Sequence, residues 1–296
     1  MAIFDTHAHY LPEDFGEELY PLLDRMPEMG VERIMAVGYD LASSEAELEL
    51  ARRYPYIVSA AGIHPENCEN LPGDWLSRIE GMLAQPEVRA LGEIGLDRHY
   101  EGYDRDLQAD VFEKQLMLAQ KLDIPVIIHS RDACEDTMTL LRKYKPRGVM
   151  HCFSYSPEIA EEVVKLGMYV GFTGVLTFRN SKKAWASCEA VPADRLLLET
   201  DSPYMAPVPH RGEKSHSGMI ILAVKVLVEL SQLVNEEHSL IYYSTAGAGA
   251  YICLFISLFK NHSCNVKLSV EREPLFAVSR LFDECLIDIG HTFKSL

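Results

Sequence analysis

Two histidines near the start of the chain, His7 and His9, lie one residue apart at the end of an apolar run. Alternate side chains of a β-strand point to the same face, so these two imidazoles would project side by side. Such a pair makes half of a metal site when other ligands come near it. An isolated His-x-His pair is more often a surface feature of a fraying terminus, so the interpretation depends on partners elsewhere in the sequence.

Possible partners occur at regular places along the chain. Each follows, or lies late in, a short apolar run that is typical of a buried strand. They are His64, Glu93, His129, His151 and Asp201. A charged residue in a core strand is expected to have a partner, because an unpaired buried carboxylate is costly. Any one of these residues fits a structural role by itself, but together with the two histidines they indicate a common site.

Six of these residues offer the ligands that two divalent cations require, namely His7, His9, Glu93, His129, His151 and Asp201. Nitrogen-rich ligation favours zinc, manganese or another transition metal, while the carboxylates also accept magnesium. Because a carboxylate has two oxygens, Glu93 can bridge two ions about 3.5–4 Å apart. Asp201 would act as a general base toward a water or serve as a further ligand. The residues therefore predict a hydrolytic site with Glu93 and Asp201 as catalytic residues.

Four further residues near the same rim would suit an anionic substrate: His64, Arg131, Ser154 and Arg211. Arg131 fits a bidentate grip on a phosphate, and a salt bridge to Asp132 or Glu135 is an equally good interpretation. Cys152 is expected to be a small buried thiol in the barrel wall, because strand alternation turns it to the face opposite His151.

The elements that must position these residues are eight apolar, β-rich runs that alternate with longer helical patterns. The runs cover residues 2–6, 33–38, 57–63, 88–95, 125–130, 148–154, 169–174 and 195–201. Residues 109–123 carry a helical stripe of Val111, Phe112, Gln115, Leu116, Leu118, Ala119 and Leu122. Apolar strands that alternate with helices form a parallel sheet covered on both faces. Eight such units predict an α/β fold, a (β/α)8 TIM barrel, with its active site at the carboxyl ends of the strands.

The composition agrees with this fold and excludes one class of function. A chain of 296 residues can hold a single barrel of about 250 residues. Lys and Arg number 28 against 44 Asp and Glu, a formal charge of −16, which argues against a broad basic surface that coats nucleic acid. The seven cysteines include no C-x-x-C pair, and polar residues interrupt any apolar leader. Reduced thiols and a cytoplasmic location are therefore expected.

These residues lie in motifs that resemble those of the TatD family of metal-dependent deoxyribonucleases, a branch of the amidohydrolase-like TIM barrels. The motifs are D-T-H-A-H at the start, G-I-H-P, G-E-I-G-L-D at 92–97, the pattern of Gln108, Phe112 and Gln115, I-H-S-R-D-A at 128–133, H-C-F-S at 151–154, G-x-x-G at 171–174 and E-T-D-S-P-Y-x-x-P at 199–207. They span residues 1 to about 230 in the family's order. The resemblance implies the same six metal ligands, with two divalent ions (Mg, Mn or Zn) as cofactors.

The resemblance also implies a substrate. It predicts hydrolysis of phosphodiester bonds in DNA, as a 3′–5′ exonuclease that prefers single strands, and it implies no stable protein partner. The family also includes members that deacylate aminoacyl-tRNA. Hydrolysis of aminoacyl ester or amide bonds, for example D-aminoacyl-tRNA deacylation, is therefore the alternative. Against an amidohydrolase with a carbamylated lysine, Glu93 occupies the strand end where that lysine would lie.

The residues after 234 depart from the family's pattern. A helical stretch at 223–234 can supply the eighth helix, but no Thr-x-x-Asn-Ala signature follows it. Residues 239–259 run 21 residues without a charge, long enough to span a bilayer, although their Ser, Thr and Gly favour packing on the barrel or disorder over membrane association. The expected domains are a barrel over 1–234 and a divergent, poorly ordered tail over 235–296. A shifted reading frame or a fused sequence would also explain the change of character.

Overall fold

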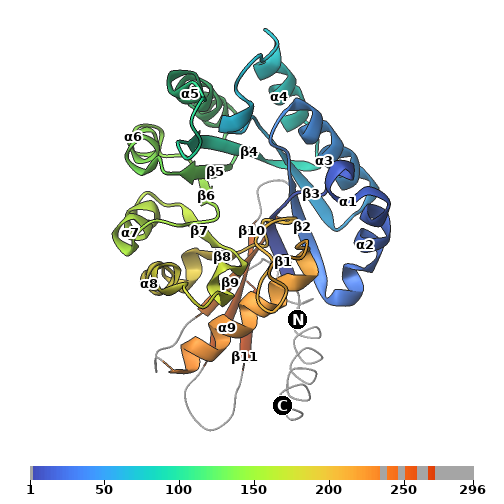
Figure 1. Cartoon of the computed structure of the whole chain (residues 1–296), viewed down its shortest axis with the longest axis vertical. Coiled ribbons are helices and arrows are strands. Elements are labelled where there is room, and N and C mark those ends of the chain that lie inside the picture. The colour runs from blue at the N-terminus through green and yellow to red at the C-terminus, as the bar shows by residue number, and fades with distance from the viewer. Residues whose placement is uncertain (1–2, 234–238, 246–250, 259–265, 271–296) are drawn as a thin grey trace.

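Eight parallel strands follow one another around a barrel in their sequence order (Figure 1). The computed structural model describes residues 3–233, 239–245, 251–258 and 266–270, with side chains up to Leu227. The strands are β1 (Ile3–Ala8), β2 (Val31–Val37), β3 (Ile57–Ala61), β4 (Val88–Asp97), β5 (Val126–Arg131), β6 (Gly148–Met150), β7 (Tyr169–Phe172) and β8 (Leu196–Leu198). The predicted α/β fold, a TIM barrel, is confirmed.

The first and last strands meet just beyond the end of β8. The amide of Asp201 donates a hydrogen bond to the carbonyl of His7 (2.9 Å), and the amide of His9 donates to the carbonyl of Ser202 (2.7 Å). These two bonds, with a parallel bridge between Ala8 and Ser202, nearly close the barrel at its carboxyl end. Closure therefore occurs beside the predicted metal ligands.

Helices surround the strands on the outside of the barrel (Figure 1). In the described part of the chain they are α1 (Pro12–Phe15), α2 (Leu19–Arg25), α3 (Leu41–Arg53), α4 (Trp75–Leu83), α5 (Arg105–Leu122), α6 (Cys134–Tyr144), α7 (Pro157–Lys165), α8 (Lys182–Ala190) and α9 (Ile220–Leu233). Polar side chains start several of them: Asp40 and Ser43 form a capping box on α3, and Asp104 accepts hydrogen bonds from two amides at the start of α5.

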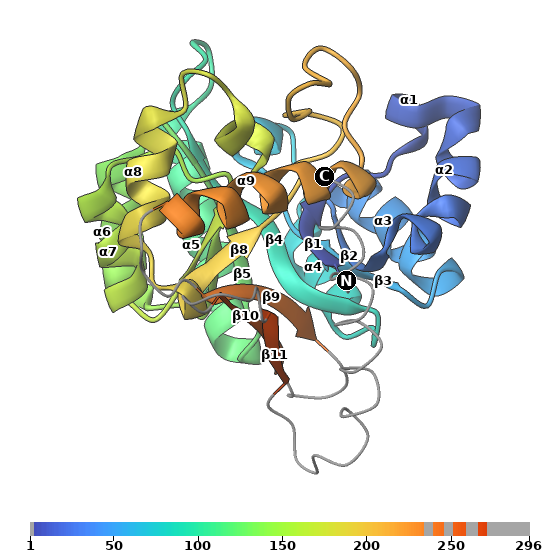
Figure 2. The same ribbon diagram turned by 90° about the horizontal axis from the view of Figure 1, so that it is seen from below.

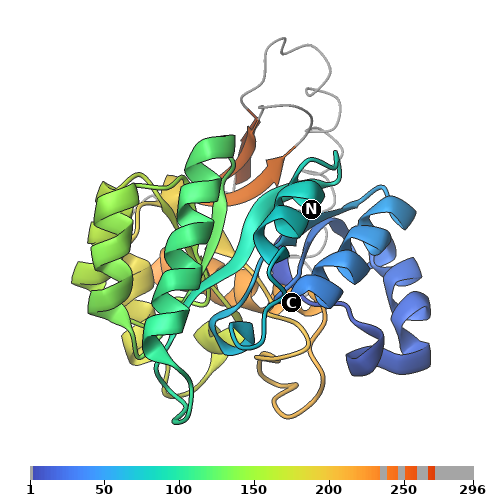
Figure 3. The ribbon, with the colours of Figure 1, turned by 90° about the horizontal axis from the view of Figure 1, so that it is seen from above.

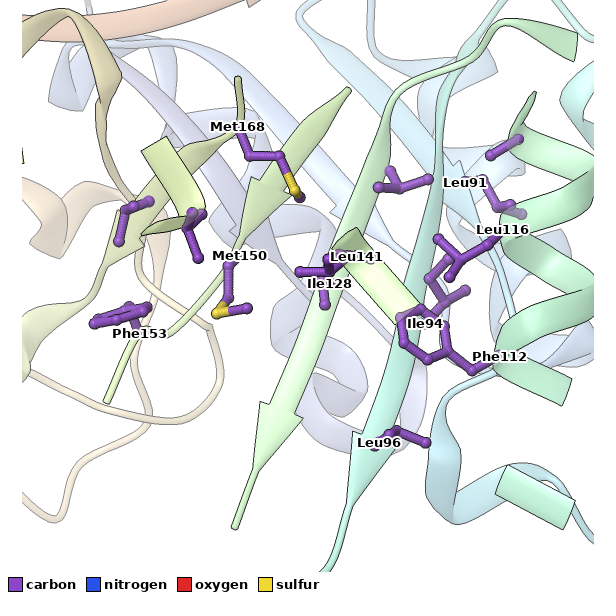
Figure 4. Close-up of a cluster of buried hydrophobic side chains, with 14 of the residues drawn as sticks. Leu91, Ile94, Leu96, Phe112, Leu116, Ile128, Leu141, Met150, Phe153 and Met168 are labelled. Atoms are coloured by element: carbon purple, nitrogen blue, oxygen red, sulfur yellow. The ribbon is translucent and has the colours of Figure 1, made fainter. Parts of the chain in front are cut away.

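The core lies between the strands and this ring of helices. In Figure 4, Leu91, Ile94 and Leu96 of β4 pack beside Phe112 and Leu116 of α5, and all five side chains are buried. The helical stripe predicted over 109–123 is therefore confirmed at these positions. Leu122 differs and is 38% exposed, because it is the last residue of α5 and lies beyond the core contact.

Four strands, β3, β6, β7 and β8, end two or more residues earlier than the sequence predicts, and the difference is largest for β6 and β8. The apolar runs extend to 154 and 201, but β6 ends at Met150 and β8 ends at Leu198. Beyond these strands, Cys152 (φ 44°) and Asp201 (φ 56°) adopt the left-handed region, which extended backbone does not enter. The chain thus turns just where polar residues follow the strands.

A second, antiparallel sheet follows α9. It consists of β9 (Ser239–Thr245), β10 (Tyr251–Leu258) and β11 (Val266–Val270) in the order β11-β10-β9, and β9 lies against β1 and β8. Figures 2 and 3 show this sheet at the end of the barrel opposite to the segment between β8 and α9. Within the described residues, every helix is too short or too polar to cross a bilayer. Residues 246–250, 259–265 and 271–296 lie outside the described residues, so the domain boundary at 234 stays a prediction.

Candidate metal centre

The structure brings together all seven polar residues of the predicted rim. His7 lies within β1, Glu93 within β4 and His129 within β5. His9 and His151 directly follow β1 and β6, and His64 and Asp201 lie three residues beyond β3 and β8. A cavity of about 530 Å³ opens at this carboxyl end of the barrel. Its lining includes His9, His64, Glu93, His129, His151 and Asp201, while His7 is fully buried beneath it.

One group of ligand atoms faces the Oε2 atom of Glu93. The Nε2 atoms of His7 and His9 are 3.1 Å apart, and they lie 3.4 and 3.6 Å from Glu93 Oε2. Asp201 Oδ1 lies 3.8 Å from both nitrogens. A tetrahedral ion with bonds of about 2.1 Å places its ligand atoms about 3.4 Å apart. The spacing of this group therefore fits a divalent metal ion.

A second group faces the other oxygen of Glu93. Glu93 Oε1 lies 2.8 Å from Nδ1 of His129 and 2.6 Å from Nε2 of His151. These two nitrogens are 3.4 Å apart. One carboxylate thus offers one oxygen to each group, which is the arrangement of a bridging ligand between two ions.

Hydrogen bonds outside the cluster fix which nitrogens face inward. Nδ1 of His9 lies 2.6 Å from the carbonyl oxygen of Val37, and Nε2 of His129 lies 3.0 Å from Asp97 Oδ2. Each of these nitrogens must carry a proton to donate, so the inward nitrogen of a neutral ring presents a lone pair. Lone pairs and carboxylate oxygens repel one another at these distances unless a cation or a shared proton lies between them. The donor set therefore fits a metal.

The pKa values show how strongly the groups interact. Burial alone would raise the pKa of Glu93, but the surrounding histidines, His151 foremost, hold it well below its usual value. Burial would lower the pKa of His151, whereas Glu93 and Glu199 raise it well above its usual value. Burial and the neighbouring His151 lower the pKa of His7 to about 4. The carboxylate is thus ionised, and the cluster favours positive charge beside it.

His64 differs from the other histidines of the rim. Its Nδ1 atom accepts a hydrogen bond from the amide of Glu66 (3.2 Å), and burial with the nearby His129 lowers its pKa to about 3. The neutral ring must then carry its proton on Nε2, which lies 3.7 Å from Glu93 Oε1. His64 therefore presents an N–H donor to the cavity rather than a lone pair.

Two acidic residues that support the cluster were missed by the sequence analysis. Asp97 orients His129, and Glu199 accepts a hydrogen bond from the amide of Cys152 (2.5 Å) and lies 3.6 Å from Nδ1 of His151. Gly171 leaves room for Glu199, since a Cβ there would lie 2.5 Å from a carboxylate oxygen. Asp97 had a detectable signal, because alternation places it on the same face of β4 as Glu93.

Of the predicted substrate contacts, His64, Arg131 and Ser154 line the cavity. Asp132 pairs with His99 and Glu135 with Arg142, so neither forms the alternative salt bridge with Arg131. Arg211 is not among the lining residues, and its guanidinium instead lies 4.0 Å above the ring of Phe178.

The Cys152 thiol is buried, as expected, but the expected place of this residue in the barrel wall is wrong. This residue lines the cavity instead of pointing into the barrel wall. It lies beyond the end of β6 in a left-handed conformation, so the alternation of a strand no longer governs its side chain. Burial, with Asp201 and Glu199 nearby, raises the pKa of its thiol well above the usual value. The thiol is thus neutral.

Comparison with known proteins agrees with this geometry. The profile of the family described as TatD related DNase matches residues 4–246, which include all seven rim residues. The uncharacterized metal-dependent hydrolase YabD of Bacillus subtilis is 37% identical over 238 residues, covering 79% of this chain and 93% of that protein. The 3′-5′ ssDNA/RNA exonuclease TatD of Erwinia tasmaniensis is 32% identical over 210 residues, covering 69% of this chain and 81% of that protein. The crystal structure of YjjV, a TatD homologue of Escherichia coli, is 30% identical with a TM-score of 0.71, covering 77% of this chain and 90% of that one.

Proposed function

Because the chain belongs to the family of TatD-related deoxyribonucleases, which are metal-dependent hydrolases of ester bonds, we propose that it hydrolyses phosphodiester bonds in DNA as a 3′–5′ exonuclease on single strands. The observation that carries the proposal is Glu93, whose two oxygens each face a separate group of ligand atoms. Relatives named as 3′-5′ ssDNA/RNA exonucleases support the choice of nucleic acid as the substrate.

The proposed cofactors are two divalent ions, Mg, Mn or Zn. His7, His9 and Asp201 would hold one, His129 and His151 the other, and Glu93 would bridge them. When bound, such ions lower the pKa of a water to about 7 and stabilise the leaving oxygen. The lining of the cavity supports the need for cations, because its described residues combine four carboxylates with a single arginine. The carboxylates are Glu66, Glu93, Asp97 and Asp201. This lining by itself repels a phosphodiester.

The chain's own residues then have distinct roles. Asp201 takes the proton of the attacking water, whose oxygen bonds to phosphorus while the bond to the leaving oxygen breaks. The Nε2 proton of His64 donates to a substrate oxygen. Arg131 pairs with a neighbouring phosphate, since a guanidinium forms bidentate hydrogen bonds with phosphate oxygens. Asp97 and Glu199 hold the two histidines of the second group in place.

The test uses single-stranded DNA labelled at its 3′ or 5′ end and protein stripped of metal, with Mg, Mn or Zn restored. We expect shortening that requires a divalent ion and releases the 3′ label first. Loss of a bridging ligand should cost more than the about 10- to 100-fold of a supporting residue, so Glu93→Gln should be more than about 100-fold slower. Thermal unfolding of both proteins establishes that the variant is folded.

Two results would contradict the proposal. Release of the 5′ label first would reverse the direction of digestion. No cleavage by folded, metal-loaded protein would remove the nuclease assignment and direct the search to aminoacyl ester and amide substrates, which the same residues could hydrolyse.

A further inference from the structure

Exposed aromatic rings lie on the wall of the metal cavity. In the described part of the structure, the large apolar side chains that remain exposed include Tyr100 (50%) and Tyr204 (59%), and both line this cavity. Scattered apolar residues on a surface need no explanation. Two half-exposed rings in the same functional cavity do need one, because exposed apolar area at a cleft marks a binding surface.

The two tyrosines stand on opposite walls. Tyr100 follows β4, and Tyr204 follows β8. The strands occur in sequence order around the barrel, so β4 and β8 are four positions apart among eight and lie across the barrel from each other. Glu93, His129 and His151 line the same cavity as both tyrosines.

Local contacts hold the ring of Tyr100 and the backbone of Tyr204. The ring of Tyr100 packs edge-on against His99, with centroids 4.8 Å apart, and the Arg131 guanidinium lies 5.2 Å from its centroid. Arg131 also donates a hydrogen bond of 3.4 Å to the Tyr100 hydroxyl. Tyr204 sits in a tight turn, in which its amide donates to the carbonyl of Asp201 (2.8 Å). The Tyr100 ring is therefore held at the cavity, so binding there would lose little conformational freedom, while the turn fixes where the Tyr204 side chain begins.

We propose that Tyr100 and Tyr204 are stacking platforms for the two unpaired bases on either side of the scissile phosphodiester. The inference rests on the proposed function, because it places that phosphodiester at the Glu93 centre. The strand then crosses the cavity from wall to wall, with one base on each ring. Bases of a duplex end are paired and stacked on each other, so they cannot separate toward opposite walls. The platforms thus explain a preference for single strands.

Stacking would supply binding energy that electrostatic attraction does not, because few basic residues line this cavity to attract the phosphates of a nucleic acid. Among the described lining residues, Arg131 is the single arginine or lysine. Every base has a π-face, so recognition by rings is independent of sequence. Removal of one stacked ring typically weakens binding about 5- to 150-fold, whereas phenylalanine retains the face.

The first experiment measures binding without turnover. The probes are phosphorothioate-linked oligonucleotides with 2-aminopurine at the terminal or penultimate position, added to the metal-loaded enzyme. We expect the wild-type enzyme to quench 2-aminopurine fluorescence at both positions. Tyr100→Ala and Tyr204→Ala should each abolish the quenching at one position and weaken binding about 5- to 150-fold. Tyr100→Phe and Tyr204→Phe should retain the quenching, because phenylalanine keeps the ring face. Tyr20→Ala is the matched control, since Tyr20 is 41% exposed in α2, against Arg53 and outside the cavity lining.

The second experiment uses cleavable strands in which one of the two bases is absent. Wild-type enzyme should cleave each abasic strand about 5- to 150-fold more slowly at low concentration. Each alanine variant should show no further loss on the strand that lacks its own base. Two results would overturn this inference but leave the proposed function standing. The first is an alanine variant whose cleavage rate falls by the same factor on intact and abasic strands. The second is an active wild-type enzyme that does not quench 2-aminopurine. A wild-type protein that neither binds nor cleaves any oligonucleotide would instead overturn the proposed function, and the platforms with it.

Discussion

Asp97 decides which nitrogen of His129 faces the metal centre. Its Oδ2 atom accepts from Nε2 of His129 (3.0 Å), which leaves Nδ1 directed at Glu93. Asp97→Asn keeps the size of the side chain but removes the charge that orients and polarises the ring. Loss of such a partner typically costs about 10- to 100-fold in metal affinity or activity. We therefore expect the metal concentration needed for half-maximal activity to rise by about 10- to 100-fold.

Asp110→Asn is the matched control for this prediction. Asp110 is an exposed carboxylate of α5 that pairs with Lys114 (2.6 Å), and exposed ion pairs contribute at most about 1 kcal/mol. Its removal should leave metal affinity unchanged. Equal metal titrations for wild-type protein and Asp97→Asn would show that Asp97 has no part in holding the ion.

The residues that sequence could predict are those whose position follows from a single strand. Alternation and strand ends suffice to place His7, Glu93 and His129 together. The role of Glu199 depends on His151 and the Cys152 amide, which lie 47 or more residues away in sequence and meet it only across the closed barrel. No local pattern encodes such contacts. The Cys152 error has the same origin, because a turn after β6 replaces the alternation of the strand.

At the scale of elements, Glu47 links α3 to the segment that follows β1 and His9. It is fully buried, and its Oε1 atom accepts a hydrogen bond of 2.6 Å from the amide of Tyr10. Burial raises its pKa to about 8, with a smaller contribution from Asp14. The folded protein thus retains a proton that the unfolded chain releases near pH 4.5. The resulting stability is present below that pH and is lost as pH rises through about 8.

Glu47→Gln should remove this dependence, since the amide oxygen still accepts from Tyr10 without acquiring charge. The variant's free energy of unfolding, relative to wild type, should increase between pH 5 and 8 by a few kcal/mol at most, because one pKa unit corresponds to about 1.4 kcal/mol. Urea unfolding at several pH values measures it. Glu45→Gln is the control on the same helix, where an exposed carboxylate pairs with Arg78 (2.8 Å). A difference between Glu47→Gln and wild type that stays constant with pH would contradict the assignment.

Strand positions were predictable because the strands of a covered parallel sheet are almost entirely apolar. The residues at which the strands end were less predictable. β8 keeps only Leu196–Leu198 of the run 195–201, because hydrogen bonds from Asp201 and His9 to the segments beside them determine where the backbone turns. The short strand is what places Asp201 over the cavity.

For the whole molecule, the repeated pattern of apolar run and helix was sufficient to predict the barrel, since each unit packs against the next. The second sheet was not predicted. Its strands β9 and β10 fall within 239–259, where a run without charge gives no period that separates a strand from other buried structure. Contacts with β1 and β8 at the far end of the barrel position β9. Because β1 and β9 are more than 200 residues apart in sequence, no local pattern predicts this contact.

The charge of the whole molecule predicts how nucleic-acid binding responds to salt. The net charge is −16, and the described residues that line the cavity include one arginine, so we expect the site to neutralise one or two phosphates, through Arg131 and at most Arg211. For single strands, the logarithm of the binding constant falls by about 0.7 per neutralised phosphate for each tenfold rise in salt. At constant divalent ion, the Kd of a phosphorothioate oligonucleotide should therefore rise only about three- to sevenfold between 50 and 200 mM KCl. Fluorescence titration measures this slope. A rise of about 100-fold or more would require about five phosphate contacts, and with them a basic surface outside the cavity.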